Sequence, residues 1–334
     1  MSKNIYSSIV QFSKEIVDLD PIDLKNARNS RKWLVDKIED FPLNDDKFPK
    51  IYNEENDVQM GSFRRHTKIR PIDDIDFIIV FSAEGTTYQR KSSSSESYEL
   101  LVPDEAERLN LYTNQNLTLN SIKVVNLLKK SLSSVPHYEK AEIQRNQEAV
   151  TLNLKSYDWN FDIVPAFITS SESNGRSYYL IPDGEGNWKK TDPRIDSTRT
   201  TEINKKRDGK ALKYIRLIKY WNRRATMPTI SSYLLENLIL NYFDKYEVST
   251  NDQSTLRDLF DYLSTAIYNN CEDPKGIQGN LNNLDIEIKN KISTMASIAK
   301  TNADNAIDYT SSDDHRSAHS LWRKIFGEDF PIYG

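Results

Sequence analysis

Hydrophobic residues recur every three or four positions near the start of the chain and again through its second half. This spacing predicts helices over residues 3–41, with an interruption at Pro21, and over residues 118–135. Further helices are predicted over residues 203–224, 231–246, 254–271, 283–308 and 312–326. From about residue 197 onward, the chain is therefore expected to be almost wholly helical.

Short runs of β-branched and aromatic residues occur only in the first half. Residues 76–81 are mostly apolar and predict a buried strand. Residues 149–154 and 161–167 predict two more strands joined by a turn, and strand signals stop near Ile181. Segments 41–46 and 89–97 show neither the helical nor the strand spacing of apolar residues. The second contains four consecutive serines, so both are predicted to be loops. The pattern describes a mixed α/β half followed by a helical half.

Composition restricts the class of protein. The 334 residues are 37% hydrophobic and 28% charged, and they contain no apolar run long enough to cross a membrane, so we expect a soluble globular protein. The N-terminus lacks the apolar core of a signal peptide, and Cys271 is the only cysteine, which excludes an internal disulfide and a cysteine-based zinc site. These features predict a cytoplasmic protein without a membrane partner.

Charge is distributed unevenly along the chain. The formal net charge is −4, whereas proteins that bind duplex nucleic acid nonspecifically are usually basic. Residues 186–225 nevertheless hold thirteen Lys and Arg against four Asp and Glu. A site for a polyanion is therefore expected to draw on this local concentration of positive charge at the junction of the two halves.

The clearest candidate chemistry is a group of aspartates. Asp74 and Asp76 lie at the start of the predicted strand with one residue between them, and because side chains alternate along a strand, both point to the same face. Adjacent carboxylates repel each other unless a cation neutralises them, and Mg²⁺ prefers oxygen ligands of this kind. Asp162 lies inside the apolar segment 161–167. If the two strands are neighbours, three carboxylates converge on a site for two metal ions of the kind that catalyse phosphoryl displacement.

Gly61 and Ser62 precede the aspartates and suit the same chemistry. Glycine allows the backbone to approach a phosphate closely, and the serine adds a hydroxyl and an N–H group to an anion-binding turn. Taken alone, each of these motifs is more often an ordinary turn, a solvated strand edge or a structural aspartate. The order and strand context of the whole set favour catalysis.

This combination is the signature of a known enzyme family. Residues 61–81 resemble the Gly-Ser, spacer and Asp-x-Asp motif of the polymerase-β-like nucleotidyltransferases. Within that superfamily the chain resembles the cGAS/DncV-like enzymes, the bacterial cyclic-oligonucleotide synthases of anti-phage signalling. The resemblance covers roughly residues 55–331, including segments 161–167, 215–222, 231–239 and 322–331.

The resemblance implies a bilobal α+β fold. Residues 1–195 would form a catalytic lobe with a mixed β-sheet and the N-terminal helices, residues 196–334 would form a helical lobe, and the nucleotides would bind in the cleft between the lobes. Asp74, Asp76 and Asp162 would be both the catalytic residues and the ligands of two Mg²⁺ ions, with Mn²⁺ as an alternative.

The resemblance also suggests nucleotide-binding residues. Besides Gly61 and Ser62, it implies that Lys219 contacts the triphosphate, that the hydroxyl of Ser232 lies near the phosphates or sugar, and that the ring of Tyr233 lies against the base. Glu236 matches the family's Ser-Tyr-x-x-Glu pattern, and its role could be structural. The expected partners are ATP and a second nucleoside triphosphate, together with regulatory or effector proteins of the same defence system, and no obligate DNA or RNA activator is expected.

Two other functions remain open at this stage. A nucleotidyltransferase of the same fold could modify RNA or protein, as tailing enzymes and toxin–antitoxin enzymes do, although no RNA-binding appendage is evident. A catalytically idle nucleotide sensor is a third interpretation, against which the three intact aspartates argue. The sequence leaves open which bases are used, the ring size and the phosphodiester linkage.

Overall fold

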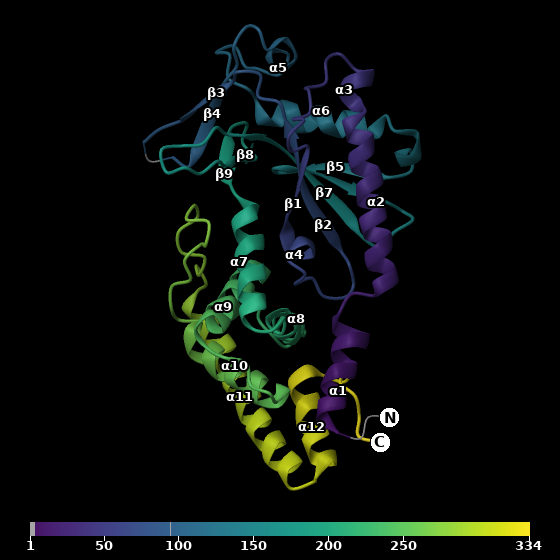
Figure 1. Ribbon diagram of the computed structural model, residues 1–334, viewed down its shortest axis with the longest axis vertical. Helices are drawn as coiled ribbons and strands as arrows, with labels where there is room; N and C mark the ends of the chain where they lie inside the picture. The colour runs from purple at the N-terminus through teal and green to yellow at the C-terminus, as the bar shows by residue number, and fades with distance from the viewer. Residues whose placement is uncertain (1–3, 94) are drawn as a thin grey trace. The chain divides into compact units, whose positions relative to one another are not determined.

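A computed structural model describes residues 4–93 and 95–334 of the chain (Figure 1). The predicted helical run over 3–41 thus begins one residue outside the described part, and Ser94 of the serine run also lies outside it. The chain divides into two compact units. The sheet unit comprises residues 21–64 and 71–195. The helical unit comprises residues 196–334, the segment that ends at Asp20, and the short segment 65–70.

The strands described in the sheet unit join in one mixed sheet of nine strands. Seven of them follow the order β1-β2-β7-β8-β9-β4-β3, and β5 and β6 extend from the other edge of β7 near its start. The β2 and β7 strands pair in parallel, and all other pairs are antiparallel. The strands are β1 (Asp57–Gln59), β2 (Asp74–Phe81), β3 (Thr87–Arg90), β4 (Ser97–Leu101), β5 (Glu142–Asn146), β6 (Ala149–Asn153), β7 (Asn160–Ile168), β8 (Tyr179–Pro182) and β9 (Trp188–Thr191).

The two faces of this sheet differ in chemistry. One face carries aromatic residues such as Phe77 and Phe161, whose rings meet edge to face at 6.3 Å. Helix α6 (Ser121–Ser133) packs against β5 to β8, and Arg31 of helix α2 (Pro21–Glu39) lies 5.0 Å above the ring of Phe77. The opposite face holds a smaller apolar cluster that includes Ile78, Val80 and Val164. The aspartates share this second face.

The sheet unit also contains four short helical turns. These are α3 (Phe41–Asn44), α4 (Gly61–Arg64), α5 (Glu107–Asn110) and the 3₁₀ turn Pro136–Tyr138. The turn α4 connects the end of β1 to the short segment 65–70 that belongs to the helical unit.

The helical unit buries a large apolar core. Its elements are α1 (Ile5–Phe12), the π-helical turn Ser13–Val17, most of α7 (Pro193–Lys206), α8 (Ala211–Asn222), α9 (Ser232–Lys245), α10 (Asp252–Ala266), α11 (Ile286–Ser311) and α12 (His315–Phe326). Trp221, Trp322 and Phe260 are almost fully buried in this core. Four buried alanines of α11 allow the neighbouring helices to approach closely, namely Ala296, Ala299, Ala303 and Ala306. Within the described residues, no helix is long and apolar enough to cross a membrane.

Several predicted boundaries were wrong for local reasons. The single helix predicted over 203–224 is two helices, because Asp208 and Gly209 adopt positive φ angles of 53° and 76° between α7 and α8. The predicted loop 41–46 begins with the helical turn α3. The predicted loop 89–97 includes the end of β3 and the start of β4, and strands continue past Ile181 to β9. The strands missed by the prediction are three to five residues long, too short for an alternating pattern to stand out.

Candidate active site

The sheet register brings two of the predicted catalytic aspartates together. In the parallel pair of β2 and β7, Asp76 lies opposite Asp162, and Asp74 lies opposite Asn160. Residues opposite each other on adjacent strands point to the same face, with backbones about 4.8 Å apart. Asp74 is two residues from Asp76 on the same strand and therefore shares that face. The three aspartates thus occupy one patch at the start of β2 and β7.

The third strand of this patch supplies a partner for Asp162. Thr151 of β6 lies opposite Asp162 in the antiparallel pair of β6 and β7, and its hydroxyl donates a 2.6 Å hydrogen bond to Oδ1 of Asp162. This contact fixes the orientation of the carboxylate. Thr151 was not singled out from the sequence, because only the register of β6 shows that it lies beside Asp162.

Gly61 lies directly against the carboxylate of Asp76. The Met60 N–H donates to the Asp76 carbonyl at 3.2 Å, and Gly61 then turns with a φ of 70° into α4. A Cβ at Gly61 would stand 1.9 Å from Oδ2 of Asp76, far inside van der Waals contact. Only glycine fits here, both for its φ angle and for the space. The predicted Gly61–Ser62 turn and the aspartate strand are therefore one packed structure.

This packing predicts a selective effect of replacing Gly61. We expect Gly61→Ala to lower nucleotide incorporation more than about 100-fold, because the added methyl group must displace Asp76, and small displacements of a catalytic group have effects of this order. Stability should fall by only about 1–2 kcal/mol, the usual cost of a left-handed alanine. Activity is measured by pyrophosphate release and stability by urea unfolding.

Gly175→Ala is a matched control for this variant. Gly175 belongs to the same unit and has a φ of 76°, but nothing lies within 4 Å of the position of its Cβ. It should show the same loss of stability with normal activity. Equal losses of activity in the two variants would contradict the proposed contact between Gly61 and Asp76.

The aspartate patch has the donor chemistry of a magnesium site. Its three carboxylates come from two paired strands, and the Gly61 backbone packs closely against Asp76. Over residues 4–93 and 95–334, no three His, Cys, Asp or Glu side chains are oriented as a finished metal site. The register places the three carboxylates on one face of the sheet.

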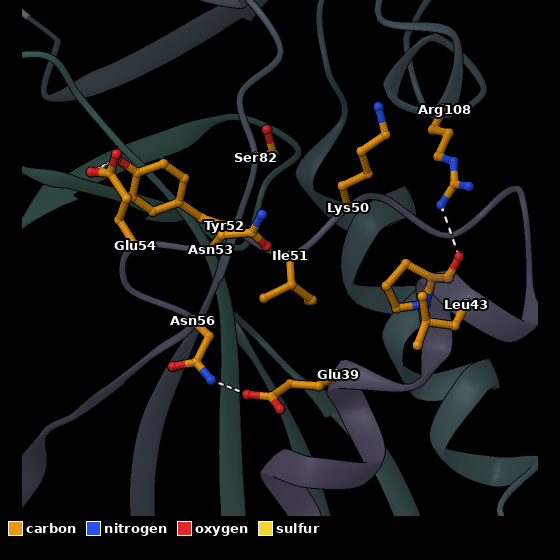
Figure 2. Close-up of a pocket in the computed structure, with 11 residues that line it drawn as sticks. Glu39, Leu43, Lys50, Ile51, Tyr52, Asn53, Glu54, Asn56, Ser82 and Arg108 are labelled. Carbon is orange, nitrogen blue, oxygen red and sulfur yellow. Dashed lines mark hydrogen bonds between the residues drawn. The ribbon is translucent and has the colours of Figure 1, made fainter.

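The sheet unit also contains a cavity away from the aspartates. Its volume is about 770 Å³, and its lining includes Lys50, Tyr52, Ser82 and Arg108 (Figure 2). Ser82 follows the last residue of β2, so it lies six residues, or roughly 20 Å, along the strand direction from Asp76. Both acidic and basic side chains line this cavity, and none of the predicted catalytic residues does. The cavity is therefore distinct from the aspartate patch.

The predicted triphosphate ligand Lys219 lies in a buried ionic cluster of the helical unit. Its Nζ is 2.7 Å from Oε1 of Glu236, while Nε and Nη2 of Arg65 both lie 3.0 Å from Oε2. The Lys219, Glu236 and Arg65 side chains are only 7%, 1% and 11% exposed. Burial lowers the pKa of Lys219, against the opposing effect of Glu236. Burial alone would raise the pKa of Glu236, but the charges of Arg65 and Lys219 hold it below its usual value.

The predicted base-stacking residue Tyr233 is held by a second cluster. Its hydroxyl lies 2.6 Å from Oδ1 of Asp196 and 3.0 Å from Oδ1 of Asp273, and it accepts a hydrogen bond from Lys275. Burial and the hydrogen bond to Asp196 raise the pKa of Tyr233 strongly, so its hydroxyl stays protonated. The Arg65 guanidinium lies 5.5 Å from the centre of the ring. Arg65 thereby connects Tyr233 to Glu236 and Lys219.

Ser232 is the third nucleotide-binding residue that was predicted in the helical unit. Ser232 is the exposed first residue of α9, one position before Tyr233. Asp196, Asp273 and Lys275 were not predicted, because they come from α7 and from the loop after α10. Nothing in their local sequence indicates that they meet at Tyr233.

Known proteins resemble this chain in sequence and in fold. No protein-family profile matches the chain. A probable cyclic nucleotide synthase of Bacillus cereus (strain VD146) is 51% identical over 333 residues, which cover 100% of this chain and 99% of the relative. The chain belongs to the cGAS/DncV-like nucleotidyltransferase family. The cyclic AMP-AMP-AMP synthase of an Acinetobacter species is 26% identical and covers 99% of the chain and 87% of its own length.

Solved structures of this family share the fold. A variant of the Vibrio cholerae di-nucleotide cyclase DncV, in complex with ATP and GTP, superposes with a TM-score of 0.72 at 14% identity and covers 100% of this chain and 98% of its own. Escherichia coli MS115-1 CdnC with ATP gives 0.69 at 17% identity, with coverages of 97% and 98%. The predicted family and the α+β nucleotidyltransferase fold are thus confirmed. This cGAS/DncV-like protein is an enzyme, a nucleotidyltransferase that makes cyclic oligonucleotides.

Proposed function

We propose that this enzyme converts nucleoside triphosphates into a cyclic di- or trinucleotide second messenger in a Mg²⁺-dependent reaction that releases pyrophosphate. The observation that carries the proposal is the pairing of Asp76 with Asp162 on one sheet face, with Asp74 beside them and Gly61 packed on Asp76. ATP is the expected first substrate, with a second nucleoside triphosphate for a mixed product. The relatives already described, named for cyclic AMP-AMP-AMP synthesis and for complexes with ATP and GTP, support this choice.

Each residue of the site has a distinct role in this proposal. Asp74, Asp76 and Asp162 would hold two Mg²⁺ ions, or Mn²⁺ in their place. When bound, these ions neutralise charge on the triphosphate and favour deprotonation of the attacking ribose hydroxyl. Thr151 orients Asp162 through its hydrogen bond.

The nucleotide-binding residues act mainly by positioning. Backbone N–H groups and the hydroxyl of the Gly61–Ser62 turn would hold phosphate oxygens. Lys219 would contact the triphosphate, Ser232 the phosphates or sugar, and Tyr233 the base. Because the hydroxyl of Tyr233 is engaged with Asp196, Asp273 and Lys275, its contact with a base would come from the ring, to which Arg65 and Lys275 already lie close. Positioning and charge neutralisation account for most catalysis in transfers of this kind.

The biological role belongs to the same proposal. We place the product in anti-phage signalling of the CBASS type, in which a cyclic nucleotide activates an effector protein. E. coli CdnC has been solved in complex with a HORMA protein, which supports a regulatory protein partner. We propose no DNA or RNA activator for this enzyme.

Product analysis tests the proposal. The purified chain is incubated with MgCl₂ and ATP, GTP, CTP and UTP, with no added acceptor, and the products are treated with phosphatase and identified by mass spectrometry. We expect a phosphatase-resistant cyclic di- or trinucleotide and no product in EDTA. Nucleotides transferred covalently onto added RNA or protein, with no cyclic product, would favour the polymer-modifying alternative and overturn this proposal.

A further inference from the structure

Arg65, Glu236 and Lys219 form a buried cluster with more positive than negative charge. One carboxylate faces two cations, and every side chain is nearly withdrawn from water. Asp196, which acts on Arg65 as well, lies with Asp273 around Lys275 and the Tyr233 hydroxyl, and Arg199 adds another cation that Asp196 acts on. A buried charge that is incompletely neutralised is costly, so this cluster favours a further anion.

The geometry of Glu236 determines how the two cations are arranged. Its two oxygens each bind a different partner, so the Lys219 ammonium and the Arg65 guanidinium are held side by side at hydrogen-bond distance from one carboxylate. A planar guanidinium and a point-charge ammonium are complementary ligands for the oxygens of a polyphosphate. Glu236 comes from α9 and Lys219 from α8, so the cluster also fixes these two helices to each other.

The chain connects this cluster directly to the predicted phosphate-binding turn. Arg65 follows α4 and comes three positions after Ser62 along the chain. A chain of three residues spans at most about 10 Å. The backbone of Arg65 therefore follows closely along the chain on the turn that is expected to hold a phosphate.

We propose that Glu236 is a positioning residue, which presents Arg65 and Lys219 as a paired cation to the triphosphate, and that the bound triphosphate supplies the negative charge this cluster lacks. The inference rests on the proposed function, because it assumes that Lys219 faces the triphosphate. It adds to that function a role for Glu236 and Arg65. In the absence of nucleotide, Glu236 keeps both cations ordered.

The test compares the thermal stabilisation that ATP gives to wild type and to Glu236→Gln, in EDTA so that no metal contributes. Without ATP, we expect the variant to unfold about 10 °C below wild type, because two buried cations have lost their carboxylate. At saturating ATP, at least half of this difference should disappear, since the triphosphate replaces the missing charge. ATP should therefore raise the unfolding temperature of the variant more than that of wild type.

A double variant separates charge balance from other effects. Lys219→Met combined with Glu236→Gln removes one charge of each sign, so it should unfold at a higher temperature than Glu236→Gln alone and gain no more from ATP than wild type. If Glu236→Gln does not fold, Glu236→Asp replaces it. The shortened carboxylate cannot reach both cations, and a smaller effect of the same sign is expected.

Asp304 provides a matched control on the surface of the same unit. It too is a carboxylate shared by a lysine and an arginine, with Lys300 at 2.6 Å and Arg257 at 3.4 Å, but it is 33% exposed. Asp304→Asn should change neither the unfolding temperature by more than a few degrees nor the effect of ATP.

Two results would overturn the inference. If the unfolding temperatures of Glu236→Gln and wild type differ by the same amount with and without ATP, Glu236 is a purely structural residue. Failure of ATP to stabilise either protein would exclude the triphosphate from this cluster. Neither result depends on product formation by wild type, so the synthesis assay shows separately whether the proposed function fails.

Discussion

Replacing both aspartates of β2, Asp74→Asn with Asp76→Asn, should lower nucleotide incorporation by at least about 1,000-fold. Asparagine retains the size of the side chain but loses the negative charge that a hard divalent cation requires. Thermal unfolding should change by no more than a few degrees, since asparagine keeps the size and shape of each side chain. Incorporation is measured by release of pyrophosphate from ATP and GTP.

A paired control distinguishes this effect from a general change in charge. Asp104 and Glu105 are adjacent, exposed carboxylates in the same unit. The variant Asp104→Asn with Glu105→Gln should retain wild-type activity. Near-normal turnover by the Asp74 and Asp76 variant would refute the assignment of these residues as catalytic.

Asp162→Asn should lower kcat by at least about 100-fold, with a smaller change in KM for ATP. The register places Asp162 opposite Asp76, so its carboxylate is the third donor of the site, and its loss affects charge that develops during the reaction more than it affects substrate binding. Steady-state kinetics at saturating Mg²⁺ separate the two parameters. A normal kcat in this variant would remove Asp162 from the site.

Thr151→Val tests how much of the contribution of Asp162 to activity depends on its hydrogen bond with Thr151. The substitution removes the donor of the 2.6 Å bond and leaves the carboxylate in place. Residues that orient a metal ligand usually contribute about 10-fold or somewhat more. We therefore expect a loss of about 10-fold, clearly below that of Asp162→Asn. Equal losses would indicate that Asp162 acts only as an acceptor for Thr151 and has a structural role.

The aspartate site could be predicted because its information is local. Alternation along a strand fixes Asp74 and Asp76 on one face whatever the rest of the fold, and the apolar context of Asp162 indicates a strand. The step that sequence alone could not make is the pairing of β2 with β7, which lie some eighty residues apart. The family resemblance supplied that step, and the structure shows it as a parallel register of Asp76 with Asp162.

The surroundings of Tyr233 and Lys219 could not be predicted, because they depend on contacts between residues far apart in the sequence. Asp196, Asp273 and Lys275 meet at one hydroxyl only because α7, α9 and the loop after α10 pack together. Lys219 is one of thirteen Lys and Arg residues over 186–225, and its burial against Glu236 distinguishes it only in the structure. Similarly, the break between α7 and α8 depends on the positive φ angles of Asp208 and Gly209. The helical spacing of apolar residues does not reveal these angles.

The most direct test of the central claim is to locate the metal ions. Crystals of the enzyme are grown with MnCl₂ and a non-hydrolysable ATP analogue, and manganese is identified by its anomalous scattering. We predict peaks coordinated by carboxylate oxygens of Asp74, Asp76 and Asp162 together with phosphate oxygens of the analogue. Manganese bound to the triphosphate without contact to these three aspartates would contradict the claim.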